Sequence, residues 1–548
     1  MASPTMPMPT PIPLPEDFPV TWESPEESML LWEQEQMHLP HAITPLGADL
    51  VQAVLPQNIT AGLQDAGAPV KAALFKVFNG YFYTGTIPDF SKIEGTEERV
   101  KAAVAERGFT MYDTWVREYL PEVEAGSAEV LGWDLERATD AQLGGYIDRT
   151  VELLQRGFYL HFRLFPGFFT AAAFADACKG LLGVTDLEAL EMLQGSENLS
   201  VESGSKLWQL AHSAEPEVAG VIRAMDSAGA LQRLAEFPEG RAFLGRLEGY
   251  LRVYGWRTGS FDISQPSWIE RPDLALDQVR LMLDVKHDPI EDQRAAAERA
   301  RALIEAARAK LASDPAALGQ FEFLLNGAKD YTKLQENHNF YLDQKFIAIA
   351  RRPFVEAGRR LAAAGVTDAD DDAYYLRLAD LRAFLDGDRS DRRQQVAAAR
   401  AERERWAAVR PPLAIGSRPP VDEASSFAVR FFGESKVPES DDAKVLKGTA
   451  SSRGTVTAVA RVIHTLDEAE RLNEGEILVC DMTTPAWTPL FAIVGGIVAD
   501  SGGALSHCAV VAREYGVPCV TGTRIATATI PDGATITLDG TNGTVTLH

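Results

Sequence analysis

One stretch of the 548-residue sequence decides the fold of the region around it: Ser501-Gly502-Gly503-Ala504-Leu505-Ser506-His507-Cys508-Ala509-Val510-Val511-Ala512-Arg513-Glu514-Tyr515-Gly516-Val517-Pro518. The apolar run 496–499 just before it predicts a buried strand, and the paired glycines predict a tight turn. A helix is expected over 506–515, with Ser506 as its N-terminal cap and Gly516 as its end. The stretch therefore predicts a strand, a glycine-rich loop and a helix in immediate succession.

His507 stands at the expected start of that helix. Free backbone N–H groups and the positive end of the helix dipole favour a group that becomes anionic at this place. A neutral imidazole nitrogen is a competent nucleophile near pH 7. These features suit a histidine that carries a phosphoryl group, although a histidine at a helix start is, taken alone, more often a capping or core residue. Cys508 is expected to pack, because adjacent helical residues point about 100° apart.

Residues 448–548 contain short β-rich runs separated by Gly and Asp-Gly turns, which predict a small α/β domain. This region resembles the phosphohistidine swivelling domain of the phosphoenolpyruvate-utilising, dikinase-like family. The resemblance implies that one module phosphorylates His507 and another dephosphorylates it. It also implies a phosphate loop of Gly502, Gly503, Ser506 and Arg513. The matching segments are 448–454, 484–489, 502–507 and 512–518.

The rest of the chain differs in its expected secondary structure. Residues 21–410 are predicted to be mostly helical, with one helix opened by Asp288 and Pro289. The fold class expected is therefore multidomain, a large helical acceptor-binding domain followed by a small β/β/α swivelling domain. The domains expected are a Pro-rich disordered tail at 1–20, the helical domain at 21–410, a linker at 411–447 and the swivelling domain at 448–548.

The helical region has a resemblance of its own, carried by Tyr254-Gly255-Trp256-Arg257 and by the segments 261–272, 336–338 and 370–372. It looks like the acceptor-side domain of rifampin-type antibiotic phosphotransferases and the large subunit of phenylphosphate-synthase-like enzymes. We therefore expect Trp256, Glu336 and Tyr341 to bind the acceptor. Where the family often has Gly-His-Arg, this chain has a tryptophan, which suits a flat acceptor.

One helical stripe suggests the rest of the site. His338, Lys345 and Arg352 are spaced by seven residues, as are Asn337, Gln344 and Arg351, so each set is expected on one helix face. His338 is the predicted general base for the acceptor hydroxyl. Arg257, Lys345 and Arg351 are the predicted clamp for the phosphoryl group. The alternative is a solvated face with structural ion pairs.

Composition limits the functional classes. Lys and Arg total 53 and Asp and Glu 78, so the net charge of −25 argues against binding to nucleic acid or an anionic membrane. The four cysteines have no metal-ligand spacing, and we predict no metal site of the chain's own. The longest apolar stretch is too short to span a bilayer. No Lys or Arg occurs before Lys71, so the positively charged region of a secretory signal is missing. A cytoplasmic protein is therefore expected.

Taken together, these features predict one subunit of an ATP-dependent phosphotransferase of dikinase type. ATP and Mg²⁺ are expected in a separate ATP-grasp subunit, because we find neither a nucleotide module nor a phosphoenolpyruvate barrel in the sequence. The expected acceptor is a phenol or aryl alcohol. Two alternatives stay open: inactivation of a larger hydroxylated antibiotic by the same chemistry, and a non-enzymatic phosphocarrier or regulatory module.

Overall fold

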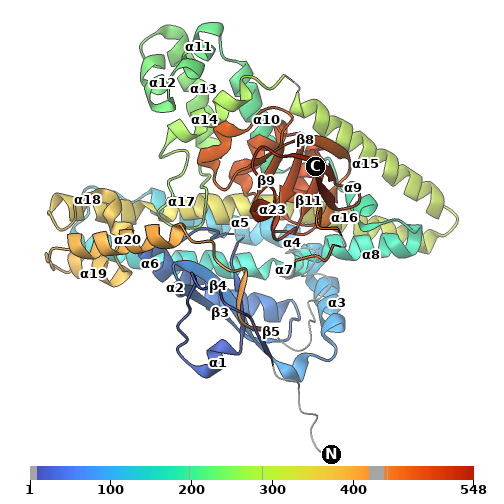
Figure 1. The fold of residues 1–548 in the computed structure, drawn as a ribbon, viewed down its shortest axis with the longest axis horizontal. Helices are drawn as coiled ribbons and strands as arrows, with labels where there is room; N and C mark the ends of the chain where they lie inside the picture. Colours follow the sequence, from blue (N-terminus) through green and yellow to red (C-terminus); the bar gives the residue numbers. More distant parts are fainter. Residues whose placement is uncertain (1–8, 37, 197, 287, 419–436, 441) are drawn as a thin grey trace, which may run out of the picture. The chain divides into compact units, whose positions relative to one another are not determined.

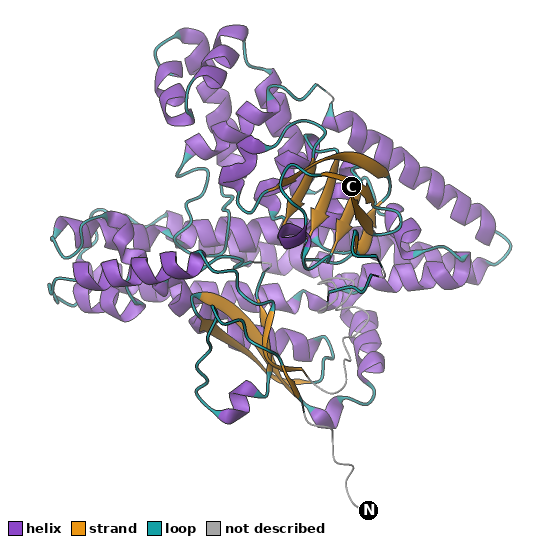
Figure 2. Cartoon of the chain, in the orientation of Figure 1, coloured by secondary structure: helices purple, strands orange, loops and turns teal. Residues whose placement is uncertain are grey.

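A computed structural model of the chain describes residues 9–36, 38–196, 198–286, 288–418, 437–440 and 442–548. The chain divides into two compact units. Unit 1 comprises residues 1–166, 260–265 and 341–424, and unit 2 comprises residues 167–259, 266–340 and 425–548. Each unit contains helices and one β-sheet (Figure 2).

The sheet of unit 1 has five strands in the order β1-β5-β2-β4-β3, and every neighbouring pair is antiparallel. Its longest pairing is a hairpin whose two-residue turn is Asn79-Gly80. Both turn residues have positive φ (50° and 78°), as a turn matched to strand twist requires. The strands are β1 (Thr10–Pro11), β2 (Leu31–Gln34), β3 (Val70–Phe78), β4 (Tyr81–Pro88) and β5 (Ala414–Arg418).

Helix α2 (Pro45–Asp65) packs on both β3 and α6 (Asp140–Arg163), and Gly62 makes the close approach possible. A Cβ atom at Gly62 would lie 2.5 Å from Cβ of Phe162. The other helices of unit 1 are α1 (Pro25–Ser28), η1 (Phe90–Lys92), α3 (Thr96–Arg107), η2 (Gly108–Thr110), α4 (Met111–Thr114), η3 (Trp115–Tyr119), α5 (Leu120–Leu131), α17 (Ile347–Ala350), α18 (Arg352–Ala363), η5 (Asp370–Tyr375), α19 (Leu378–Leu385) and α20 (Arg393–Ala407). Helices α7 (Phe165–Phe168) and η4 (Asn339–Phe346) cross the division between the units.

The sheet of unit 2 has eight strands in the order β6-β13-β12-β8-β9-β10-β11-β7. Figure 1 labels β8, β9 and β11 of this sheet. The four strands β8 to β11 are parallel to one another, and β9 and β10 are buried throughout, as is typical of parallel strands covered on both faces. The strands are β6 (Val445–Lys447), β7 (Thr449–Ser452), β8 (Thr455–Val462), β9 (Ile477–Cys480), β10 (Gly496–Ala499), β11 (Cys519–Thr521), β12 (Thr535–Asp539) and β13 (Thr544–Leu547).

A single apolar core joins this sheet region to the helices of unit 2. It contains Leu207 and Val279 from the helical part together with Leu490 and Val511 from the C-terminal part. The helices are α8 (Thr170–Leu182), α9 (Asp186–Glu191), α10 (Leu199–His212), α11 (Pro216–Ala224), α12 (Ser227–Leu234), α13 (Pro238–Tyr254), α14 (Pro272–Met282), α15 (Pro289–Leu311), α16 (Pro315–His338), η6 (Leu466–Arg471), η7 (Pro485–Ala492), α22 (His507–Tyr515) and α23 (Ala526–Thr529).

The fold class is confirmed, because a large helical region precedes a small C-terminal α/β domain. The expected boundaries need correction. Residues 21–410 are divided between both units and include β2, β3 and β4. The sheet of the C-terminal domain begins before residue 448, because β6 pairs with β13.

The tail and the linker also differ from expectation. Residues 1–8 lie outside the described part. Thr10 and Pro11 pair with β5, and Phe18 is fully buried among aromatic rings. Residues 9–20 are therefore ordered by packing, which the Pro-rich composition does not predict. Of the expected linker, 419–436 and 441 lie outside the described residues, and its two ends form β5 and β6. No helix of the described part is both long enough and apolar enough to cross a membrane.

Candidate functional site

The glycine-rich loop follows β10 and leads directly into α22, as the sequence predicts. Gly502 has φ 93°, a left-handed conformation that favours glycine. Ser506 occupies the cap position, but the capping prediction is wrong in detail. Its hydroxyl donates to the Gly503 carbonyl (2.8 Å) and accepts no helix N–H. The serine therefore closes the loop onto itself.

Arg513, predicted to contact phosphate, supports the loop from within the protein. Its buried Nη1 donates to the carbonyls of Ser451 and Ala504, both at 2.9 Å. Burial lowers the pKa of the guanidinium, and the nearby Tyr331 opposes that shift. Arg513 thus links β7 to the glycine-rich loop, and the bonds it makes in this structure are to backbone.

His507 begins α22 and is buried against a carboxylate from a distant part of the sequence. Its Nδ1 lies 2.9 Å from Oε2 of Glu336, which is fully buried on α16. The ring of Phe491 meets the imidazole edge-on at 6.4 Å. Nε2 is buried and makes no hydrogen bond to any residue that the structure describes. One ring nitrogen is therefore held and the other is available for chemistry.

The Glu336 carboxylate decides which imidazole nitrogen carries the proton. Burial alone would raise its pKa, but the charge and hydrogen bond of His507, with Ser200 and His338, hold the pKa below the ordinary value. An ionised carboxylate only accepts hydrogen bonds, so Nδ1 carries the hydrogen. In the neutral imidazole, Nε2 then keeps the lone pair that a nucleophile needs.

Arg257 is a fully buried cation in the same unit. Its Nε donates to the Pro485 carbonyl (3.3 Å) and its Nη2 to the Leu199 carbonyl (3.4 Å), and the guanidinium lies over the Phe340 ring. Burial lowers its pKa, and Tyr250 and Glu336 oppose the shift. The structure thus brings Arg257, Glu336 and His507 into one electrostatic cluster.

Further bonds hold α22 against the helices of unit 2. The Tyr331 hydroxyl donates to the Leu505 carbonyl at 3.0 Å, and the Gly195 N–H donates to the Glu514 carboxylate at 2.9 Å. Gln194 Nε2 donates to the Arg513 carbonyl at 2.6 Å. Burial raises the pKa of Glu514 to about 7, against the opposing Gly195 hydrogen bond and Arg513 charge. These bonds attach the glycine-rich loop to α16 and attach α22 to the turn after α9.

The other predicted site residues of unit 2 are His338 and Trp256. His338 is buried, and its Nδ1 donates to the Leu334 carbonyl at 2.7 Å. Trp256 is half-buried just beyond the end of α13. Their roles as general base and acceptor contact stay predictions.

Lys345, Arg351 and Tyr341 belong to unit 1, whereas His507 belongs to unit 2. Lys345 Nζ pairs with the Glu124 carboxylate at 2.8 Å and lies over the Tyr341 ring. Arg351 donates to the carbonyls of Ile263 and Ser264. Residues 339–346 form a π-helix, so the seven-residue stripe does not stay on one face, because a π-turn holds more residues than an α-turn.

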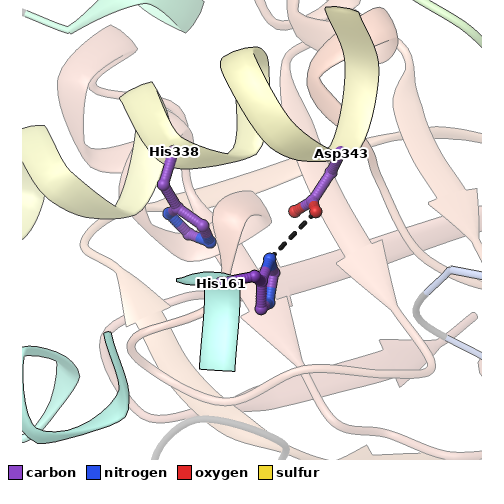
Figure 3. Close-up of side chains that lie close together, drawn as sticks. All are labelled: His161, His338 and Asp343. Carbon is purple, nitrogen blue, oxygen red and sulfur yellow. Dashed lines mark ion pairs between the residues drawn. The ribbon is translucent and has the colours of Figure 1, made fainter. Parts of the chain in front are cut away.

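Unit 1 contains a buried acid–histidine pair that sequence patterns did not reveal (Figure 3). His161 Nδ1 lies 3.0 Å from Oδ1 of Asp343, and both side chains are almost wholly buried. The rings of Phe158 and Phe162 flank the imidazole. His338, which Figure 3 also draws, belongs to unit 2. The sequence around His161 does not indicate that a distant carboxylate lies beside the imidazole in the folded protein.

Unit 1 also has a pocket of about 520 Å³, a volume typical of small-molecule sites. Its wall combines an indole ring, aliphatic side chains and two guanidinium groups. The lining residues come from α2, the β3–β4 hairpin, α20 and their surroundings: Ile43, Thr44, Pro45, Ala48, Gln52, Val77, Gly80, Arg377, Ala399, Glu402, Arg403 and Trp406. They are scattered along the sequence, so only the tertiary structure reveals the pocket.

Two family models match parts of the chain. Residues 472–543 match the mobile domain of phosphoenolpyruvate-utilising enzymes, and residues 160–336 match the fourth domain of rifampicin phosphotransferase. The first match contains His507, and the second contains Arg257 and ends at Glu336.

Three relatives are similar to this chain over nearly its whole length. The chain is 29% identical to a rifampicin phosphotransferase of Streptomyces sviceus over 94% of its own length and 59% of the relative. It is 26% identical to the uncharacterized phosphotransferase YvkC of Bacillus subtilis over 94% and 62%. It is 32% identical to chondramide synthase of Chondromyces crocatus over 98% of this chain and 14% of that protein. The chain thus spans less than two thirds of each of these relatives.

Proposed function

Because the chain is related to phosphoenolpyruvate-utilising enzymes and rifampicin phosphotransferases, we propose that it transfers a phosphoryl group through His507. The observation that supports this most directly is the Nδ1–Glu336 contact, which leaves Nε2 as the nucleophile. The Nε2 lone pair forms the bond to phosphorus while the donor's bond to its leaving group breaks. Throughout this step Nδ1–H keeps donating its hydrogen bond to the Glu336 carboxylate. The negative charge of the carboxylate stabilises the ring as the ring gains positive charge.

We propose ATP as the phosphoryl donor, bound with Mg²⁺ by a separate ATP-grasp subunit in the cytoplasm. In a dikinase-type cycle, ATP, the acceptor and water yield AMP, inorganic phosphate and the phosphorylated acceptor. Arg257 is the cation of this chain that we assign to the phosphoryl group, because it is fully buried in the electrostatic cluster of His507. The assignments of Lys345 and Arg351 to that clamp have no comparable support, since both belong to unit 1.

For the acceptor we propose a small aromatic alcohol or phenol. The unit 1 pocket supports an enzyme over a pure phosphocarrier, because it has a suitable volume and an indole wall at Trp406. A larger hydroxylated antibiotic is the second candidate, and the similarity to rifampicin phosphotransferases favours it equally.

The carrier role is tested with potassium phosphoramidate, a phosphoryl donor that needs no nucleotide module. Nε2 attacks phosphorus, the P–N bond breaks and ammonia leaves. We expect one acid-labile, base-stable phosphate per chain, located on His507 by mass spectrometry. His507→Ala should take up none, whereas His212→Ala, which changes an exposed histidine on α10, should behave as the wild type. Equal labelling of His507→Ala would refute the proposal.

The acceptor is tested with the phosphorylated chain. Loss of the label to a phenol panel or to rifampicin, followed by ³¹P NMR of the product, distinguishes the two acceptor classes. Transfer to neither class, together with transfer to a second protein, would instead establish the phosphocarrier alternative. Adding ATP, Mg²⁺ and the proposed ATP-grasp subunit should produce AMP, and ADP as the sole product would contradict the dikinase cycle.

A further inference from the structure

Several buried polar atoms of unit 2 make no hydrogen bond within the described structure. They include Nη1 of Arg257, the hydroxyls of Thr488 and Tyr515, and Nε2 of His507. Native proteins seldom leave such atoms unsatisfied, so each one calls for a ligand, an ion or an ordered water. His507 already has a role as the phosphoryl carrier, whereas neither the family matches nor the sequence patterns assign one to Thr488 or Tyr515.

We propose that the hydroxyls of Thr488 and Tyr515, together with Nη1 of Arg257, form an anion subsite that binds phosphate or a transferred phosphoryl group. The three hydrogen-bond donors indicate that the ligand is an anion. That this anion is the phosphoryl group carried by His507 rests on the proposed function. Both hydroxyl-bearing residues are positioned by contacts that the structure defines.

Tyr515 ends α22, the helix that His507 begins. Its ring lies 6.1 Å from that of Phe491, which in turn meets His507, so one aromatic side chain connects the two residues. The hydroxyl reaches α10 at a place where only glycine fits. A Cβ atom on Gly204 would lie 2.2 Å from the Tyr515 oxygen and 3.4 Å from Cγ2 of Thr488. Thr488 and the Tyr515 hydroxyl therefore both border Gly204.

Thr488 is fully buried on η7, three residues after Pro485. In a 3₁₀-helix the carbonyl of one residue points toward the residue three positions later, and the Pro485 carbonyl also accepts from Nε of Arg257. Arg257 therefore meets η7 at the turn that contains Thr488. Burial and the nearby Tyr250 raise the pKa of Tyr515, and the positive charge of Arg257 opposes the shift.

The chemistry of these groups selects an anion. A guanidinium only donates hydrogen bonds, and both hydroxyls can donate, so together they complement the oxygens of a phosphate group. Oε2 of the nearby Glu336 carboxylate pairs with His507. The positive charge of the buried Arg257 guanidinium would repel a cation, which favours an anion as the ligand.

The test uses inorganic phosphate and the full chain. Tyr515→Phe and Thr488→Val each delete one hydroxyl and preserve shape. We expect each variant to bind phosphate about tenfold or more weakly than the wild type, measured by the phosphate-dependent rise in Tm against chloride at equal ionic strength. We also expect the Tm without phosphate to be unchanged or raised, because a buried hydroxyl without a partner stabilises nothing.

Tyr250→Phe is the matched control. The Tyr250 hydroxyl bonds to Ser203 at 3.0 Å, so its loss should lower the Tm and leave phosphate affinity unchanged. Wild-type phosphate affinity in both Tyr515→Phe and Thr488→Val would overturn the proposal, as would a fall in their Tm like that of the control.

The test also separates this proposal from the function on which it rests. His507→Ala removes the carrier but retains all three donors, so it should still bind inorganic phosphate. If the wild type binds phosphate and His507 takes no label, the carrier function fails and the subsite stands. If His507 takes label and phosphate has no effect on the Tm, the subsite fails and the carrier function stands.

Discussion

His507 Nδ1 and Glu336 Oε2 lie 2.9 Å apart although 171 residues separate them in the sequence. The carboxylate is fully buried, and the imidazole is its hydrogen-bond partner. This pair orients the ring and sets the tautomer, so that Nε2 keeps its lone pair.

Glu336→Gln tests that role. A glutamine amide can donate to Nδ1 and so stabilise the tautomer with its hydrogen on Nε2, which is not nucleophilic there. We expect labelling of His507 by phosphoramidate to slow by about 10²-fold or more, followed as acid-labile phosphate against time. Glu202→Gln, a change on α10 that keeps a hydrogen-bond acceptor for Tyr254, is the control. An unchanged rate in Glu336→Gln would show that the carboxylate does not set the tautomer.

Tyr331→Phe should weaken the attachment of the glycine-rich loop to α16. The phenol donates to the buried Leu505 carbonyl, and its removal leaves that carbonyl without its hydrogen bond. We expect a loss of about 1–2 kcal/mol in the free energy of unfolding, measured with urea. Tyr515→Phe, which removes a buried hydroxyl without a partner in the described structure, should show no such loss. Equal losses in the two variants would contradict the assignment of the Tyr331 hydrogen bond.

Gly204→Ala should be destabilising in spite of the better helix propensity of alanine. The new methyl group would meet the Tyr515 hydroxyl at 2.2 Å, so the tyrosine or α10 must move. The matched control is Gly220→Ala on α11, where nothing lies within 4 Å of the added carbon, and it should gain about 0.5–1 kcal/mol.

The same clash predicts a specific rescue. Without the hydroxyl, the nearest ring carbon lies 3.5 Å from the Cβ position, which is ordinary contact. Gly204→Ala should therefore lose about 1–3 kcal/mol in the wild-type background and much less in Tyr515→Phe. A double-mutant cycle measured by urea unfolding checks this, and additive effects would exclude the predicted contact.

Glu514 should make the stability of the native state depend on pH. Burial raises its folded-state pKa to about 7, above the unfolded value, so the folded protein favours the protonated form. Its stabilising contribution is fully present below the unfolded pKa of about 4.3 and is lost as pH rises through about 7.

Glu514→Gln isolates this effect, because the amide oxygen still accepts from the Gly195 N–H. Relative to the variant, the wild type should lose up to about 3 kcal/mol of unfolding free energy between pH 5 and pH 8. Urea titrations across that range measure the difference. Parallel pH profiles for the two proteins would mean that Glu514 ionises normally in the folded state.

Local patterns in the sequence were sufficient for the elements around His507. The apolar strand, the paired glycines and the helix ending at Gly516 all form where expected, because turn chemistry and strand burial act over a few residues. Asp288 likewise caps α15, with its carboxylate accepting from the Ile290 N–H. Local rules were weaker where two local options compete, as at Ser506, whose hydroxyl bonds to the loop and not to the helix.

Long-range packing decided the remainder. The heptad stripe through Lys345 assumed α-helical periodicity, and the π-helix at 339–346 changes that phase. The ordered segment around Phe18 depends on aromatic partners, including Trp406, that lie far along the chain. Neither a π-turn nor a distant aromatic partner has a signature in local composition.

The sequence by itself therefore determined that a histidine lies at the start of a helix behind a glycine-rich loop. Tertiary structure alone decided that Glu336 holds one nitrogen of that histidine and that the buried Arg257 donates to the carbonyl of Pro485, 228 residues away. The physical reason is the range of the interactions. Capping and turn formation depend on neighbouring residues, whereas a buried charge is stable only where packing brings its partners together.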